Sequence, residues 1–84
     1  MIEIAGITFD RTPSGPIHAP ADMIRVCAYH IDFDERPTCY IDVADIAEAR
    51  FICSNIGSAR GQWNVDYAIA YDADGDVVVP FDWL

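Results

Sequence analysis

The sequence contains no lysine, and its five basic residues are all arginines. Against them stand eleven aspartates and three glutamates, which leave a formal net charge of −9 at pH 7. Because contacts to phosphate groups need Lys or Arg side chains, this balance argues against direct binding to DNA, RNA or anionic lipid. It favours encounter with basic partner proteins, although acidity also keeps a small protein soluble.

Long apolar runs are also missing. No segment approaches the roughly 18 apolar residues that a membrane-spanning helix needs. The opening stretch, MIEIAGITFD, has neither a basic region nor a small-residue cleavage site, so we expect no signal peptide and a cytoplasmic protein. Hydrophobic residues make up 52% of the 84 residues, which suffices for the packed core of a single domain over residues 1–84.

The cysteines are few and odd in number. Cys27, Cys39 and Cys53 form no CxxC or CxxH pair, which disfavours a structural zinc site. We therefore expect reduced, mostly buried thiols. Cys27 and Cys39 fall on segments that are expected to pair as strands, which would bring the two residues near each other.

Periodicity of the apolar residues predicts five strands and one helix. The expected strands cover residues 2–9, 23–33, 38–43, 62–71 and 77–81. In the first of them the alternation changes parity at Ala5 and Gly6, which predicts a bulge or bend. Short connections favour antiparallel neighbours, so the sequence predicts an α+β fold of order β-β-β-α-β-β. Its mainly antiparallel sheet would carry one helix on one face.

The predicted helix begins near Asp42, a suitable N-cap, and stops at Gly57. Apolar residues at helical spacing form its expected buried face: Ile46, Ala49, Cys53 and Ile56. Phe51 falls on the opposite side, where it either packs under a loop or makes an exposed contact. In the strand at residues 62–71, the face that includes Asp66, Ala68 and Ala70 is the expected polar face.

The stretch YDADGDVVV, residues 71–79, resembles a calcium loop at first sight. If Asp72 occupied position one of an EF-hand loop, the glycine position would be Val77 and the final glutamate would be Trp83. The spacing therefore disfavours calcium and predicts no metal site. Asp74 and Gly75 instead predict the two central residues of a type I′ hairpin turn.

Residue patterns for catalysis are thin. The glycines are dispersed and form no phosphate-binding loop, and no serine stands in a nucleophile elbow. His30 and Asp32 share a strand face, so a small enzyme or metal protein centred on this pair is one hypothesis. A structural or exposed pair is the commoner arrangement. We therefore predict that the protein is not an enzyme, has no catalytic residues and needs no cofactor.

The acidic residues suggest a binding surface instead. Spaced carboxylates on one face could imitate a phosphate backbone and occupy an Arg/Lys-rich groove. The predicted partner-binding residues come from two turns and one strand: Asp32, Asp34, Glu35, Asp66, Asp72, Asp74 and Asp76. The alternative is that these acids are scattered and merely solvated.

The chain resembles small acidic phage-encoded inhibitors, and among them the anti-CRISPR proteins. The resemblance covers length, charge and element order, while DERP, DADGD and PFDWL match no diagnostic motif. It implies a stoichiometric inhibitor in the host cytoplasm that binds a Cas subunit of a type I Cascade complex and keeps target DNA out. The alternative is a small structural or assembly protein that forms a homo-oligomer, such as a homodimer built by adding edge strands or by packing PFDWL, residues 80–84.

Overall fold

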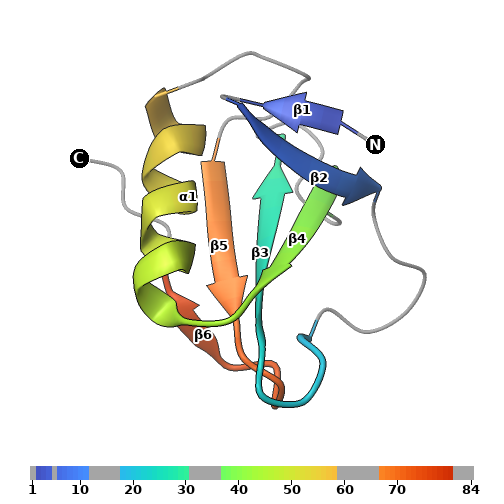
Figure 1. The fold of residues 1–84 in the computed structure, drawn as a ribbon, viewed down its shortest axis with the longest axis vertical. Coiled ribbons are helices and arrows are strands. Elements are labelled where there is room, and N and C mark those ends of the chain that lie inside the picture. The colour runs from blue at the N-terminus through green and yellow to red at the C-terminus, as the bar shows by residue number, and fades with distance from the viewer. Residues whose placement is uncertain (1, 5, 12–17, 31–36, 59–66, 81–84) are drawn as a thin grey trace.

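The computed structural model describes residues 2–4, 6–11, 18–30, 37–58 and 67–80 (Figure 1). Six strands and one α-helix lie in these ranges. In chain order they are β1 (Ile2–Ile4), β2 (Ile7–Arg11), β3 (Ile24–Tyr29), β4 (Cys39–Val43), α1 (Ile46–Ser58), β5 (Tyr67–Tyr71) and β6 (Val77–Val79).

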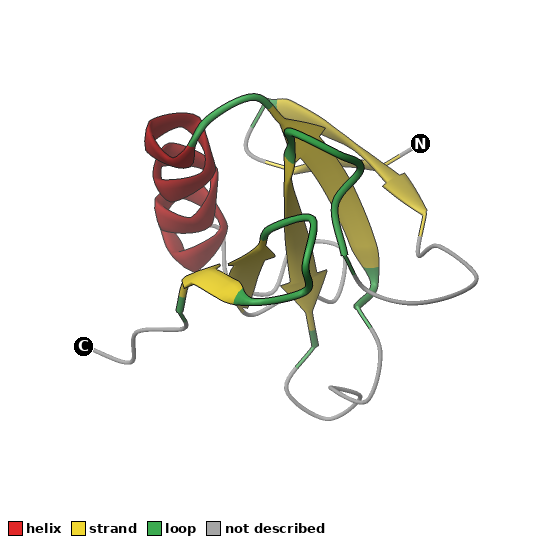
Figure 2. Ribbon diagram, turned by 90° about the horizontal axis from the view of Figure 1, so that it is seen from below, coloured by secondary structure: helices red, strands yellow, loops and turns green. Residues whose placement is uncertain are grey.

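The described strands form one sheet in the order β1-β2-β4-β3-β5-β6, with every neighbouring pair antiparallel. Because β3 lies between β4 and β5, these two strands run parallel to each other. The chain passes between them through α1, which lies on one side of the sheet (Figure 2). The predicted α+β fold, with one helix on a mainly antiparallel sheet, is confirmed.

The first predicted strand is a hairpin rather than one bent strand. β1 and β2 pair with each other, and Ile4 is the cross-strand partner of Ile7. Gly6 has a φ of +80°, in the left-handed region that glycine enters without steric cost. The parity change in the sequence therefore marks a reversal of the chain, not a bulge.

The helix begins later than its pattern predicts. Asp45, not Asp42, is the N-cap, since its Oδ1 accepts a hydrogen bond of 2.8 Å from the Glu48 N–H. Asp42 belongs to β4 instead. At the other end, α1 continues through Gly57 to Ser58. Asp42 lies in β4, whose pairing with β3 keeps it in an extended conformation. The helix therefore begins after Asp45, which becomes its N-cap.

The core lies between α1 and the sheet. Ala49, Ile52 and Ile56 of α1 are buried against β3 and β5, where Ala68 and Ala70 are 5% and 0% exposed. The expectation of a polar face at Ala68 and Ala70 was therefore wrong. Small side chains let the helix approach the sheet closely, so the alanines belong to the helix side.

Phe51 lies on the outer side of the helix, as its position in the period predicts. Its side chain is 65% exposed, which decides between the two expectations for it in favour of an exposed residue. Isolated exposed apolar side chains are common on protein surfaces, so the exposure alone assigns no role to it. Ile46 was predicted for the buried face of the helix, which was wrong, because it is the first residue of α1 and its side chain is 41% exposed.

Candidate functional site

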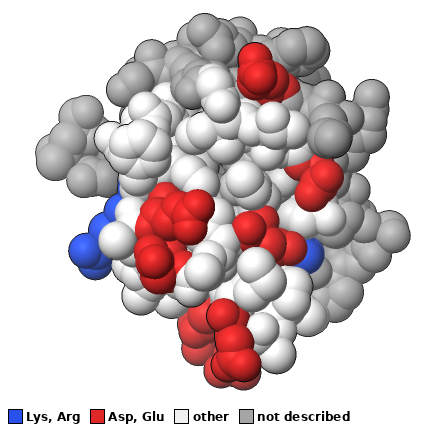
Figure 3. Space-filling view, in the orientation of Figure 1, with Lys and Arg blue, Asp and Glu red and all other residues white. Residues whose placement is uncertain are grey.

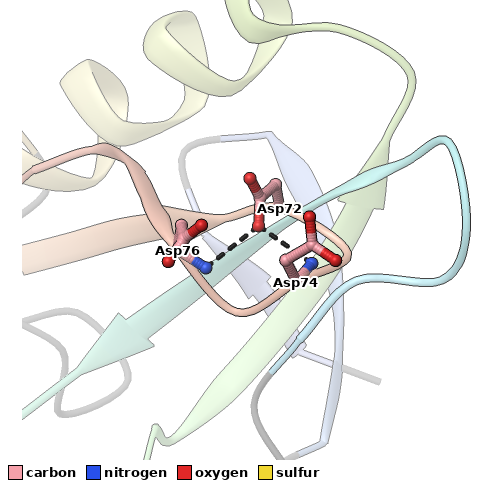
Figure 4. A group of neighbouring side chains, drawn as sticks. All are labelled: Asp72, Asp74 and Asp76. Atoms are coloured by element: carbon pink, nitrogen blue, oxygen red, sulfur yellow. Dashed lines mark hydrogen bonds between the residues drawn. The ribbon is translucent and has the colours of Figure 1, made fainter.

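The turn between β5 and β6 brings three of the predicted acidic residues together (Figure 4). Asp72, Asp74 and Asp76 each offer a carboxylate oxygen, and these oxygens lie within 4.8 Å of one another. Asp72 is half-buried, whereas Asp74 and Asp76 are exposed. The turn thus concentrates negative charge at one end of the sheet.

The carboxylate of Asp72 organises this turn. Its Oδ1 accepts hydrogen bonds from the backbone N–H groups of Asp74 and Asp76, both at 2.9 Å (Figure 4). Its backbone carbonyl accepts from the N–H groups of Gly75 and Ala19, both at 3.1 Å. Asp72 therefore holds the turn and joins it to the loop before β3, while Asp74 and Asp76 project their charge outward.

The turn is not the predicted type I′. That type needs positive φ at both Asp74 and Gly75, but among the described residues only Gly6, Asp22 and Gly75 have positive φ. Gly75 has a φ of +84°, and the Asp72 N–H donates to the Asp76 carbonyl at 2.9 Å. This is a three-residue loop closed by a left-handed glycine. The additional residue lets Asp72 reach both backbone amides.

The other predicted partner-binding residues, Asp32, Asp34, Glu35 and Asp66, lie outside the described residues. Their membership of one surface with the turn stays a prediction, as does the absence of a metal ion. On the face seen in Figure 3, acidic groups are spread in separate clusters over uncharged surface, and basic groups show only at the margins. The lowest acidic cluster lies where the β5–β6 turn reaches the bottom of Figure 1.

The face of the sheet away from α1 carries all four tyrosines of the protein, Tyr29, Tyr40, Tyr67 and Tyr71. We call it the tyrosine face. The hydroxyl oxygens of Tyr29 and Tyr71 are 2.7 Å apart and share a hydrogen bond. The rings of Tyr29 and Tyr67 stack with their centroids 5.3 Å apart and their planes 10° from parallel.

Arg25 is held on the tyrosine face by a carboxylate and a ring. Its Nε and a terminal guanidinium nitrogen donate to the two oxygens of Asp42, at 2.8 and 3.1 Å. Its Cζ lies 4.3 Å from the centroid of the Tyr40 ring. The hydrogen bond with Asp42 raises the pKa of Arg25 and so stabilises the charged guanidinium.

Sequence reasoning identified the strand at residues 23–33, in which the alternate residues Arg25, Cys27 and Tyr29 share one face. It missed the tyrosine face as a unit, because strand order is not visible in the periodicity of single strands. The sequence signal for this face was the alternation of apolar and aromatic residues in the segments that form β3 and β5.

No family model matches the chain, and no curated protein or solved structure is significantly similar to it. Within the described ranges, no helix is long and apolar enough to cross a membrane.

The three thiols do not support nucleophilic chemistry. β3 and β4 pair as expected, but Cys27 points to the tyrosine face and Cys39 to the helix side. Burial raises the pKa of Cys27 to about 12 and those of Cys39 and Cys53 to about 11. Since the thiolate is the reactive form, all three are poor nucleophiles near neutral pH.

Proposed function

We propose that the protein is a non-enzymatic acidic binding protein that occupies the basic, nucleic-acid-binding surface of another protein. The observation that carries this proposal is the β5–β6 turn, where the exposed carboxylates of Asp74 and Asp76 lie beside that of Asp72. Among the described residues, the ion pair that is found joins Arg25 to Asp42. Arg25 is the cross-strand partner of Tyr71, next to the turn, but its guanidinium is engaged by Asp42. The turn's charge is thus available to a partner's arginines and lysines.

The anti-CRISPR resemblance suggests which partner to test. In this proposal the protein is a phage inhibitor, and its acidic surface covers the DNA-binding groove of a type I CRISPR–Cas effector. The net charge of −9 supports it, because such a field accelerates encounter with a strongly basic groove. Carboxylates spaced along a surface can take the place of phosphates in contacts with Arg and Lys.

A homo-oligomer is supported less well by the sheet edges. β1 and β6, the outer strands of the described sheet, have three residues each, and Pro80 follows β6 directly. Short edge strands and a flanking proline are features that oppose edge-to-edge pairing. Two copies that each carry −9 would also repel one another.

The proposal is tested by binding to a purified type I effector complex over a range of salt concentrations. We expect binding that competes with target DNA and weakens as salt rises. The double variant Asp74→Asn/Asp76→Asn should bind several-fold more weakly. Asp72 is left intact, because its carboxylate supports the turn.

The matched control is Glu3→Gln/Glu48→Gln, which removes the same charge at two exposed positions on other elements. It should retain most of the affinity if the turn is part of the surface. Equal weakening by both double variants would show a net-charge effect without a site. Absence of binding to the effector and to other DNA-binding proteins at low salt would refute the proposal.

A further inference from the structure

The tyrosine face shows how this sheet accommodates a guanidinium group. Arg25 is fixed there by two hydrogen bonds to the Asp42 carboxylate and by the Tyr40 ring 4.3 Å from its Cζ. A carboxylate beside the face of an aromatic ring is a good environment for arginine, whose planar group pairs bidentately with the carboxylate and stacks on the ring. The same Tyr40 ring has a second carboxylate beside it, on the side of β4 away from Arg25.

Asp10 provides it. In the β2–β4 register Asp10 is the direct partner of Tyr40, so both side chains project from the tyrosine face. Directly opposed residues have Cβ atoms about 5 Å apart. Asp10 is exposed and Tyr40 is half-buried. Arg25 approaches the ring from β3, whereas Asp10 lies on β2, on the other side of β4, so a partner's guanidinium would use the side of the ring that faces β2. Arg25 and Asp42 already pair with each other, whereas the carboxylate of Asp10 has no ion-pair partner among the described residues.

We propose that Asp10 and Tyr40 form a receptor for arginine side chains of the basic partner, with the guanidinium bound to the carboxylate and stacked on the ring. The proposal rests on the proposed function and names the residue type that the surface selects. Charge complementarity supports this occupant, since the chain carries −9 and contains no lysine. A second copy is disfavoured by the same charge.

Arginine rather than lysine is the expected ligand. Guanidinium is more weakly hydrated than ammonium, stacks on aromatic rings and meets a carboxylate with two parallel hydrogen bonds. An acidic surface that acts by charge alone would bind both residue types equally. The preference between them therefore separates this receptor from the general acidic field.

The experiment uses hexa-arginine and hexa-lysine peptides, titrated calorimetrically into the full-length protein at low salt. We expect hexa-arginine to bind roughly threefold to tenfold more tightly than hexa-lysine. Tyr40→Leu should abolish this preference and Tyr40→Phe should keep it, because the ring and not the hydroxyl makes the stack. Circular dichroism verifies that each variant is folded.

Asp10→Asn tests the receptor at an exposed position that does not support the core. It should weaken hexa-arginine binding several-fold, whereas the control Glu48→Gln on α1 should not. Equal affinity of the wild-type protein for hexa-arginine and hexa-lysine would overturn this inference. Equal weakening of hexa-arginine binding by Asp10→Asn and Glu48→Gln would also overturn it. In that case salt-dependent binding that still needs Asp74 and Asp76 would leave the proposed function standing, while failure to bind any basic ligand would remove both.

Discussion

Replacing Asp72 by alanine should destabilise the protein far more than replacing either of its acidic neighbours. The Asp72 carboxylate accepts two backbone hydrogen bonds of 2.9 Å, from Asp74 and Asp76. An alanine leaves both N–H groups without this acceptor. Asp74 and Asp76 are exposed and have no corresponding role in the described turn.

The magnitude follows from the two lost bonds. A hydrogen bond contributes about 0.5–1.5 kcal/mol net, and exposed amides recover part of this by binding water. Removing one of the three neighbouring carboxylates also relieves their repulsion, which restores a few tenths of a kcal/mol of stability. We therefore expect the free energy of unfolding to fall by about 1–2 kcal/mol. In a domain of this size that lowers the melting temperature by roughly 5–15 °C.

Urea unfolding followed by tyrosine and tryptophan fluorescence measures the effect. Asp74→Ala and Asp76→Ala, which remove the same charge, should change the unfolding free energy by less than about 0.5 kcal/mol. Asp72→Asn retains an acceptor oxygen and should lie between Asp72→Ala and wild type. If Asp72→Ala is no less stable than Asp74→Ala, the carboxylate does not hold the turn and the reasoning fails.

Three further predictions concern other positions. Gly75→Ala should lower the unfolding free energy by about 1–2 kcal/mol, because the backbone φ there is +84°. The nearest atom to an added Cβ would be 3.9 Å away, so the cost comes from backbone strain and not from a clash. An unchanged unfolding free energy in urea would contradict the left-handed turn. Asp45→Ala should lower the unfolding free energy by about 1 kcal/mol by removing the N-cap of α1, whereas Asp45→Asn should lower it little. Equal decreases in melting temperature for the two variants would exclude a capping role. Burial raises the pKa of Cys27 from 9.0 to about 12, so the folded state holds this proton longer than the unfolded state does. Its contribution to stability is therefore complete below pH 9 and declines as the pH rises from 9 toward 12. In urea unfolding at a series of alkaline pH values, the unfolding free energy of Cys27→Ala should fall less steeply with pH than that of wild type. The same slope in both proteins would contradict this assignment.

Much of the fold follows from periodicity. Alternation located the strands, and the 3.6-residue period identified Ala49 and Ile56 as buried on α1 and placed Phe51 on the opposite side of the helix. These predictions succeed because they depend on which face of an element meets the core. They need no knowledge of which strand lies beside which.

The wrong predictions concern residues whose local sequence is compatible with two different structures. Gly6 is compatible with a bulge or a reversal, and Asp42 with a helix cap or a strand, and only pairing with neighbouring strands decides. The polar interpretation of Ala68 and Ala70 failed because alanine tolerates either environment, and proximity to α1 assigns it to the core. The candidate site shares this limit, since the partnership of Asp10 with Tyr40 depends on the β2–β4 register.

Three evenly spaced aspartates in DADGD look equivalent in the sequence, but the structure divides them into two classes. Asp72 is part of the fold, and Asp74 and Asp76 are free to contact a partner. The same division applies elsewhere, because Asp45 caps α1 and Asp42 neutralises Arg25, whereas Asp10 has an exposed carboxylate. Net charge therefore overstates what this surface offers to a partner. Loss of binding after removal of a structural acid reports on folding. Variants of Asp10, Asp74 and Asp76, compared with the controls at Glu3 and Glu48, therefore separate recognition by position from attraction by charge.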